Sequence, residues 1–286
     1  MSLLPDYIQE QVRQSLNEDV ASGDLTAMLV PQNAHVKASI ITRQKAVIVG
    51  KDWVEEVFNQ LDSTIEIHWF CDDGDEIESD GLLCEISGNA RSLLTGERTA
   101  LNFLQTLSAV ATKTRLYVDV VKGTNVNILD TRKTIPGLRL SQKYAVTCGG
   151  GVNHRIGLYD AMLIKENHIA AAGSIASAFE QALKLVEPEV SIEMEVESLD
   201  EMEQALNAGV ERLLLDNFNL QQLRDAVSLN NEKYRGKARL EASGNVTLET
   251  VRAIAETGVN DISVGELTKN IAAVDLSMRI LSSDIE

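Results

Sequence analysis

The chain gathers its positive charge in the segment from Arg98 to Lys165. That segment holds ten Lys and Arg residues against three Asp, a balance of +7, which leaves −24 for the rest of a chain whose formal net charge is −17. A basic cluster focuses small anionic substrates, whereas an acidic chain as a whole repels nucleic acid and acidic membranes. A solvated basic face is the usual explanation of a charge run, but several of these cations directly follow short apolar runs. We therefore predict a site for a small polyanion, and neither a nucleic-acid nor a membrane partner.

Polar side chains recur directly after six short apolar runs. In chain order they are Thr131-Arg132-Lys133, Lys165-Glu166-Asn167, Glu195 or Glu197, Asp216-Asn217, Ser243-Gly244-Asn245 and Gly265-Glu266. In α/β barrels the catalytic groups come from several strand ends on one face. This recurrence is therefore what an active site would look like in the sequence.

Two kinds of chemistry suit these positions. Ser243-Gly244-Asn245 and Val264-Gly265-Glu266 follow the last two runs, where barrels often bind phosphate through backbone N–H groups; glycine after a strand is also often only a turn. Glu195 and Asp216 could accept hydrogen bonds from sugar hydroxyls or help to hold a hydrated Mg²⁺. Ion pairing of these carboxylates with nearby Lys and Arg is the competing explanation, and it does not exclude the functional one.

The elements that must position these residues follow from the hydrophobic pattern. Short apolar runs at 126–130, 161–165, 190–196, 212–216, 239–243 and 261–265 alternate with helical segments at 137–147, 175–186, 199–207, 220–229, 248–257 and 267–281. Six alternations predict parallel strands with crossover helices. We favour a (β/α) barrel over an open doubly wound sheet because polar residues recur at the strand ends. Six strands rather than eight would leave the barrel incomplete.

The chain before residue 113 has a different pattern. A helical period at 3–19 is followed by strand patterns at 36–49, 65–70 and 82–86 around a short amphipathic helix at 53–61, which predicts an α+β domain. A long helical pattern covers 93–117, and Thr95-Gly96 allows a break in it. We assign residues 1–112 to the N-terminal α+β domain with its leading helix, and residues 113–286 to the barrel, whose last helix packs back on the first domain.

The three cysteines and the lack of long apolar runs bear on the compartment. Cys71, Cys84 and Cys148 are odd in number and lack CxxC spacing, so reduced thiols in the cytoplasm are the simplest interpretation. There is no run of about 18 apolar residues, the length typical of a transmembrane helix. The first residues lack the apolar core of a signal peptide. These observations predict a cytoplasmic protein.

Seven motifs resemble the quinolinate phosphoribosyltransferase family, also called the carboxylating nicotinate-nucleotide pyrophosphorylases. They run in the order of the family over nearly the whole chain: EDVASGDLT (18–26), ERTALN (97–102), DTRKTIPGLR (130–139), LIKENH (163–168), EMEVES (193–198), LLLDNF (213–218) and EASGN (241–245). The resemblance implies an N-terminal α+β domain on an incomplete, seven-stranded α/β barrel, working as a homodimer with Mg²⁺. It also implies transfer of phosphoribose from phosphoribosyl pyrophosphate (PRPP) to quinolinate with decarboxylation. The products would be nicotinate mononucleotide, pyrophosphate and CO₂, in the biosynthesis of NAD.

The resemblance also implies a role for each site residue. Arg98 resembles the arginine that reaches into the site of the neighbouring subunit. The substrate-binding cations would be Arg132 and Lys133 with Thr131, followed by His154, Arg155 and Lys165. Glu195 and Asp216 match the acidic pair around the ribose and Mg²⁺, and the catalytic set would be Lys133, Lys165, Glu195 and Asp216. Ser243, Gly244 and Asn245 match one 5′-phosphate loop, and Val264, Gly265 and Glu266 match the other.

Three other functions are compatible with parts of this pattern. A nicotinate-specific phosphoribosyltransferase would share the architecture but needs only one carboxylate site, and the density of cations here favours a dicarboxylate. A barrel lyase or aldolase would use Lys165 as a Schiff-base amine. A non-catalytic relative would keep the fold and bind an anion, against which stand the intact cationic and acidic sets.

Overall fold

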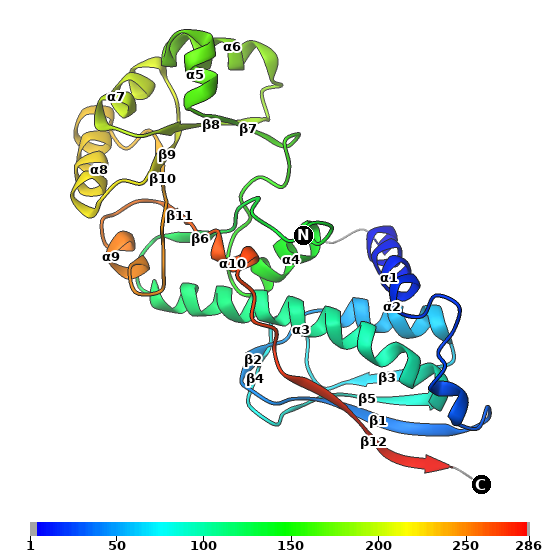
Figure 1. Cartoon of the computed structure of the whole chain (residues 1–286). Coiled ribbons are helices and arrows are strands. Elements are labelled where there is room, and N and C mark those ends of the chain that lie inside the picture. The colour runs from blue at the N-terminus through cyan, green and yellow to red at the C-terminus, as the bar shows by residue number, and fades with distance from the viewer. Residues whose placement is uncertain (1–4, 285–286) are drawn as a thin grey trace. The chain divides into compact units, whose positions relative to one another are not determined.

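The structure, a computed structural model that describes residues 5–284, divides into two units by the contacts within it. One unit contains residues 5–113, 140–149 and 270–284, and the other contains residues 114–139 and 150–269 (Figure 1). The division predicted after residue 112 treats each domain as one continuous segment. The units of the structure, in contrast, each combine separate pieces of the chain.

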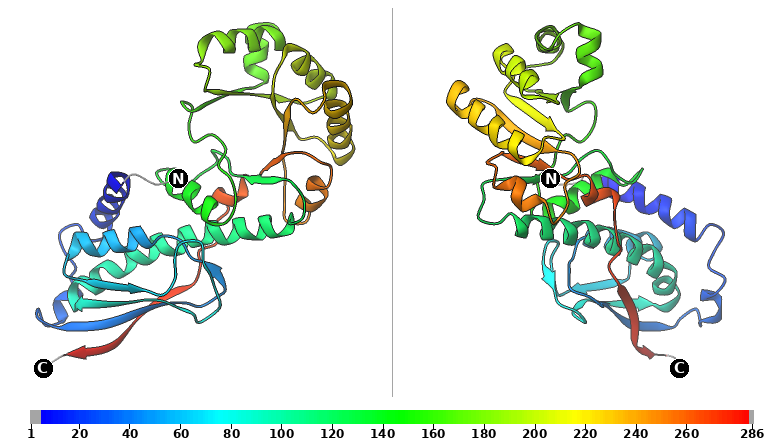
Figure 2. Two further views of the ribbon diagram at one scale, coloured as in Figure 1. Left: turned by 180° about the vertical axis from the view of Figure 1, so that it is seen from behind. Right: turned by 60° about the vertical axis from the view of Figure 1, so that its left-hand side comes forward.

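An antiparallel sheet in the order β12-β1-β5-β3 forms the centre of the first unit. Its strands are β1 (His35–Thr42), β3 (Glu66–Trp69), β5 (Leu82–Asn89) and β12 (Leu276–Asp284), and the short strands β2 (Ala46–Val47) and β4 (Glu76–Ile77) pair separately. The helical elements are α1 (Pro5–Asp19), η1 (Ala27–Leu29), α2 (Lys51–Leu61), the first part of α3 (Ala90–Val120) and most of α4 (Arg139–Cys148). Helices α2 and α3 lie over one face of the sheet (Figures 1 and 2). The fully buried side chains of Trp53 on α2 and Ile40 on β1 belong to this core.

Helix α3 runs without a break through Gly96, where the sequence allowed one. A Cβ atom added at Gly96 would lie 2.8 Å from both Leu61 Cδ1 and Phe58 Cε1. The glycine is therefore needed for the close approach of α2 and α3, and not for a turn.

The helix predicted over 267–281 is wrong. Only Glu266–Lys269 is helical (α10), and the chain then continues as β12, which pairs antiparallel with β1 from Leu276 to Asp284. Leu276, Met278 and Ile280 alternate with polar residues, which is the period of a strand. The sequence of this stretch alone is compatible with either a helix or a strand. The strand forms because the stretch pairs with β1, which lies more than 200 residues earlier in the chain. Residues 276–284 thus complete the sheet of the first unit instead of packing on it as a helix.

A parallel sheet in the order β6-β11-β10-β9-β8-β7 forms the second unit. Its strands are β6 (Asn127–Leu129), β7 (Ala161–Ile164), β8 (Ser191–Val196), β9 (Arg212–Asp216), β10 (Arg239–Ser243) and β11 (Asp261–Ser263). The helices are the last part of α3 together with α5 (Glu166–Ala172), α6 (Ile175–Leu185), α7 (Leu199–Ala208), α8 (Leu220–Tyr234), α9 (Val251–Ala255) and α10. Helices α6 to α9 surround the outer side of the curved sheet (Figure 1). The six predicted parallel strands are confirmed.

The barrel of the second unit is incomplete, as expected. Strands β6 and β7 are the two edges of the sheet and do not pair with each other. A single parallel bridge joins Leu129 of β6 to Val152, in the segment between α4 and β7. This short extended piece lies beside β6 and is not one of the six strands of the sheet. Within residues 5–284, no helix has the length and apolar character needed to cross a membrane.

The three cysteines give a prediction about reactivity. Burial raises the pKa of Cys71 to about 11 and that of Cys84 to about 12, and it also raises the pKa of Cys148. Because the thiolate is the reactive form, iodoacetamide at pH 8 should leave Cys71 and Cys84 unmodified in the folded protein. Intact-mass measurement over one hour checks this, with the same protein in guanidinium chloride as the fully labelled control. Rapid labelling of both thiols under native conditions would contradict their burial.

Candidate active site

A cavity of about 540 Å³ lies at the carboxyl ends of the parallel strands in the second unit. Its lining consists of Thr131, Arg132, Lys133, His154, Arg155, Leu163, Lys165, Glu195, Leu214, Asp216, Asn217, Glu241, Ser243, Gly244, Asn245 and Ser263. Most of the residues predicted from the sequence thus surround one space. The first unit has a cavity of about 600 Å³, but its charged lining is Asp52, Glu55 and Glu56 without a cation, so it does not suit an anion.

The loop after β6 supplies the first group of cations. The backbone N–H of Lys133 donates to Thr131 Oγ1 at 3.1 Å, and the Lys133 carbonyl accepts from Thr268 Oγ1 at 2.8 Å. Both bonds fix the backbone of the loop, so the lysine side chain remains available to the cavity. The Nε atom of Arg132 is buried and has no hydrogen-bond partner among the residues of 5–284. An unsatisfied guanidinium N–H at a cavity wall is suited to an anionic ligand.

Asp130 joins this loop to the segment that carries His154 and Arg155. It is fully buried, and its carboxylate accepts hydrogen bonds from Asn153 Nδ2 at 2.6 Å and from the backbone N–H of His154 at 2.9 Å.

Arg132 and Arg155 influence each other across the cavity wall. Burial, followed by the nearby charge of Arg132, lowers the pKa of Arg155. The two arginines are therefore close enough to repel each other. A dianionic ligand between them would relieve that repulsion.

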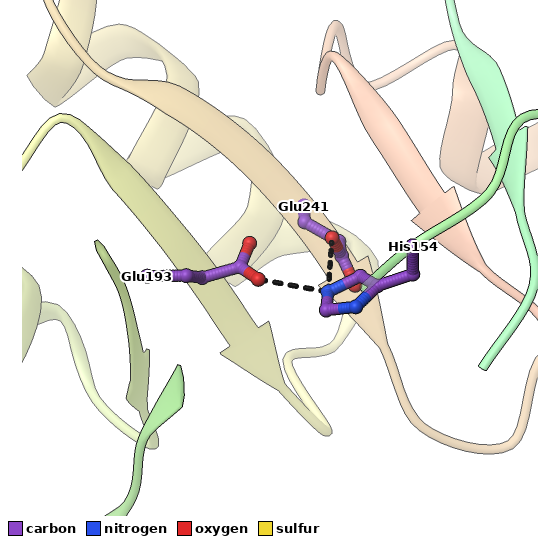
Figure 3. A group of neighbouring side chains, drawn as sticks. All are labelled: His154, Glu193 and Glu241. Carbon is purple, nitrogen blue, oxygen red and sulfur yellow. Dashed lines mark hydrogen bonds and ion pairs between the residues drawn. The ribbon is translucent and has the colours of Figure 1, made fainter. Parts of the chain in front are cut away.

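His154 contacts two buried carboxylates, Glu193 on β8 and Glu241 on β10 (Figure 3). Its Nε2 lies 2.8 Å from Glu193 Oε2 and 3.4 Å from Glu241 Oε2. Burial lowers the pKa of His154, but the hydrogen bonds and charges of the two carboxylates outweigh burial and raise the pKa to about 10. Burial and the neighbouring Glu193 raise the pKa of Glu241. His154 therefore keeps its proton at pH values where an imidazole in water has lost it, and Glu241 loses its proton at a higher pH than a carboxyl group in water.

The ligand atoms of this trio lie within 4.8 Å of one another, as in a metal site. However, Nε2 lies beside both carboxylates, so a hydrogen is favoured on it whether the imidazole is neutral or protonated. Nε2 then carries a hydrogen and donates it to Glu193, which leaves no lone pair for a metal ion. We interpret the trio as a charge-paired support in the wall of the cavity, which His154 and Glu241 line.

The acidic side of the cavity is formed by Glu195 and Asp216. Lys165 Nζ lies 2.5 Å from Glu195 Oε2, and the side chains of this pair are 43% and 10% exposed, respectively. Asp216, at the end of β9, accepts a hydrogen bond from Asn217 Nδ2 at 2.7 Å. Glu195 therefore forms an ion pair with Lys165 and also lines the cavity, so the ion pair does not exclude a role in binding substrate.

The two predicted phosphate loops differ in their relation to the cavity. Ser243, Gly244 and Asn245 line it, with Gly244 at φ 104° and Asn245 at φ 50°. Val264, Gly265 and Glu266 do not line it. Val264 is buried, and Glu266 accepts a hydrogen bond from the Tyr117 hydroxyl. A Cβ at Gly265 would lie 3.2 Å from Lys133 Cδ, so this glycine makes room for the lysine.

Arg98 lies in the first unit, on α3, with an exposed side chain, and it is not part of the cavity lining. Four lining residues were not singled out in the sequence: Leu163, Leu214, Glu241 and Ser263. The period of two along a strand could have found Glu241, which lies two residues before Ser243, and likewise Glu193, two residues before Glu195.

Comparison with known proteins finds one family over most of the chain. Residues 24–108 match the quinolinate phosphoribosyl transferase N-terminal domain, and residues 110–279 match the C-terminal domain of the same family. A nicotinate-nucleotide pyrophosphorylase [carboxylating] from Mycobacterium leprae is 40% identical over 96% of this chain and 97% of its own length. A chloroplastic protein of the same name from Arabidopsis thaliana is 38% identical over 96% of this chain and 84% of its own length.

Among solved structures, the nicotinate-nucleotide pyrophosphorylase from Francisella tularensis is 48% identical, with a TM-score of 0.94 and 98% coverage of both chains. That from Ehrlichia chaffeensis is 37% identical, with a TM-score of 0.91 over 98% of this chain and 100% of its own. The chain contains both domains of the family in the expected order, and relatives of this similarity match it over nearly its full length. The chain belongs to the quinolinate phosphoribosyltransferase family.

Proposed function

We propose that this protein transfers the phosphoribosyl group of PRPP to quinolinate and decarboxylates the product, which yields nicotinate mononucleotide, pyrophosphate and CO₂ for NAD biosynthesis. The observation that carries the proposal is one cavity that combines a cationic wall, an acidic pair and a glycine-containing strand-end loop. The substrates together bear two carboxylates, a pyrophosphate and a phosphate. A wall of Arg132, Lys133, Arg155 and Lys165 has the charge that such a set of anions requires.

The reaction needs positioning and charge stabilisation more than acid–base chemistry. The pyridine nitrogen of quinolinate is already a nucleophile, so it attacks C1′ while pyrophosphate leaves, without a strong general base. The ring then carries a positive charge, which stabilises the electron pair left at C2 when the 2-carboxylate departs as CO₂, and a proton replaces it. Lys133 and Lys165 act as cations that stabilise the departing pyrophosphate and hold the substrate carboxylates, since fixed charges in a cavity lower the barrier most where charge develops.

Glu195 and Asp216 are the residues that would hold Mg²⁺ beside the ribose, directly or through water. Their carboxylate oxygens are the ligand type that Mg²⁺ prefers, and both line the cavity. The ion would supply positive charge to the pyrophosphate of PRPP. Ser243, Gly244 and Asn245 bind the 5′-phosphate, and Gly265 leaves space for Lys133.

The working form is a homodimer in the cytoplasm, in which Arg98 of one subunit serves the cavity of the other. Its exposed position on α3, outside the cavity of the second unit, is compatible with a role across a subunit boundary. The three free cysteines suit a reducing compartment.

The direct test is to supply the protein with PRPP, Mg²⁺ and either quinolinate or nicotinate. Nicotinate mononucleotide is measured by chromatography, and CO₂ is measured by release of label from the 2-carboxylate. We expect product and equimolar CO₂ from quinolinate alone. Turnover of nicotinate would assign the protein to nicotinate-specific chemistry, and no turnover of either by a folded protein would support the anion-binding alternative.

A further inference from the structure

Asn217 connects the end of β9 to the end of β10 at the rim of the cavity. Its Nδ2 donates to Asp216 Oδ2 at 2.7 Å, and its backbone N–H donates to the carbonyl of Ser243 at 2.9 Å. Asp216 and Ser243 are also direct neighbours in the register of the two strands. One residue therefore contacts both the acidic side of the cavity and the loop at 243–245.

The conformation of Asn217 is fixed on two sides. Its backbone has φ 57°, in the left-handed region that asparagine tolerates better than most residues. On the other side, a Cβ added at Gly244 would lie 2.2 Å from Asn217 Oδ1 and 2.8 Å from its Cγ. The amide is thus held between the Asp216 carboxylate and the backbone of Gly244. The opposite amide orientation would place its oxygen against the carboxylate, so only the donating orientation is favourable.

We propose that Asn217 is a positioning residue that holds the Asp216 carboxylate at a fixed separation from the Gly244 loop. The inference rests on the proposed function, in which Asp216 faces the ribose and residues 243–245 bind the 5′-phosphate. Both groups belong to the ribose 5-phosphate part of PRPP, so their separation determines where C1′ lies relative to the ring nitrogen of quinolinate. A displacement of about 1 Å at a reacting centre costs on the order of a hundredfold in rate.

The test is Asn217→Gly, which keeps the left-handed backbone accessible and removes only the amide. We expect the KM for PRPP to rise at least about tenfold and kcat to fall. The inhibition constant of ribose 5-phosphate, which would span both subsites, should rise at least about fivefold, whereas that of inorganic pyrophosphate and the Kd of quinolinate should change less than about twofold. Arg235→Gly is the matched control, because Arg235 is an exposed left-handed residue (φ 60°) at the end of α8, outside the cavity lining.

A second variant tests the contact with Gly244. Gly244→Ala should raise the KM for PRPP strongly in the wild type, because the new methyl group displaces the amide of Asn217 and because alanine is strained at φ 104°, a strain that is the same in both backgrounds. In the Asn217→Gly background the same substitution should have a clearly smaller effect, since residues in contact are non-additive. Additive effects, or an unchanged inhibition constant for ribose 5-phosphate in Asn217→Gly, would overturn the inference.

Two further outcomes are distinguishable from these. An equal loss of affinity for ribose 5-phosphate and pyrophosphate would mean a general disruption of the cavity and would also overturn the positioning role. Failure of the wild-type protein to convert quinolinate would remove the proposed function itself, before any variant is compared.

Discussion

Lys165→Met is expected to lower kcat/KM for quinolinate by about a hundredfold to a thousandfold, the range found when one charge-stabilising donor is removed from an active site. Lys165 follows β7 at the cavity, and its ammonium lies 2.5 Å from Glu195. The substitution removes a cation from the anion site and leaves Glu195, whose side chain is 10% exposed, without its ion-pair partner. Both effects act in the same direction, because an unpaired carboxylate repels the substrates.

Lys165→Arg separates the charge role from a Schiff-base role. An arginine keeps the positive charge but cannot form an imine, so it should recover at least about tenfold of the activity lost in Lys165→Met. Lys184→Met, at an exposed position in the last turn of α6, is the matched control and should have wild-type kinetics. Complete inactivity of the arginine variant, together with trapping of a keto substrate on Lys165 by borohydride, would instead support lyase chemistry.

The parallel strands were predictable because each is a short apolar run followed by a polar group. In β9, Leu213 and Leu215 are fully buried, and the strand ends at Asp216 on the cavity. The hydrophobic pattern of a few consecutive residues is enough to predict such a strand, because both the buried run and the polar residue that follows it lie within that short stretch. For β12 it does not suffice, because the partner that makes residues 276–284 a strand is β1.

The trio of His154, Glu193 and Glu241 shows a different limit. A glutamate within a strand next to apolar residues is expected at the surface, yet Glu193 and Glu241 are 4% and 1% exposed. Two carboxylates are tolerated there because His154 comes between them from a loop that neither strand's sequence specifies. Residues two positions apart on a strand share a face, so Glu195 and Ser243 could have led to these two glutamates, but not to the histidine that contacts them.

Mixing two inactive variants is expected to restore activity if Arg98 serves the neighbouring subunit. Arg98→Ala and Lys165→Met homodimers should each have less than about 1% of wild-type kcat/KM, since each removes a cation from every site. In a hybrid dimer one site would lack both residues and the other would lack neither. After random exchange half of the dimers are hybrids with one intact site, so recovery should approach about a quarter of wild-type activity.

The matched control is a mixture of Lys133→Met and Lys165→Met. These two residues lie in the same cavity of one chain, so every site remains defective and no recovery follows. Exchange is verified by native mass spectrometry of the mixed dimers. If hybrids form and activity stays at the level of the parents, Arg98 acts within its own subunit or not at all.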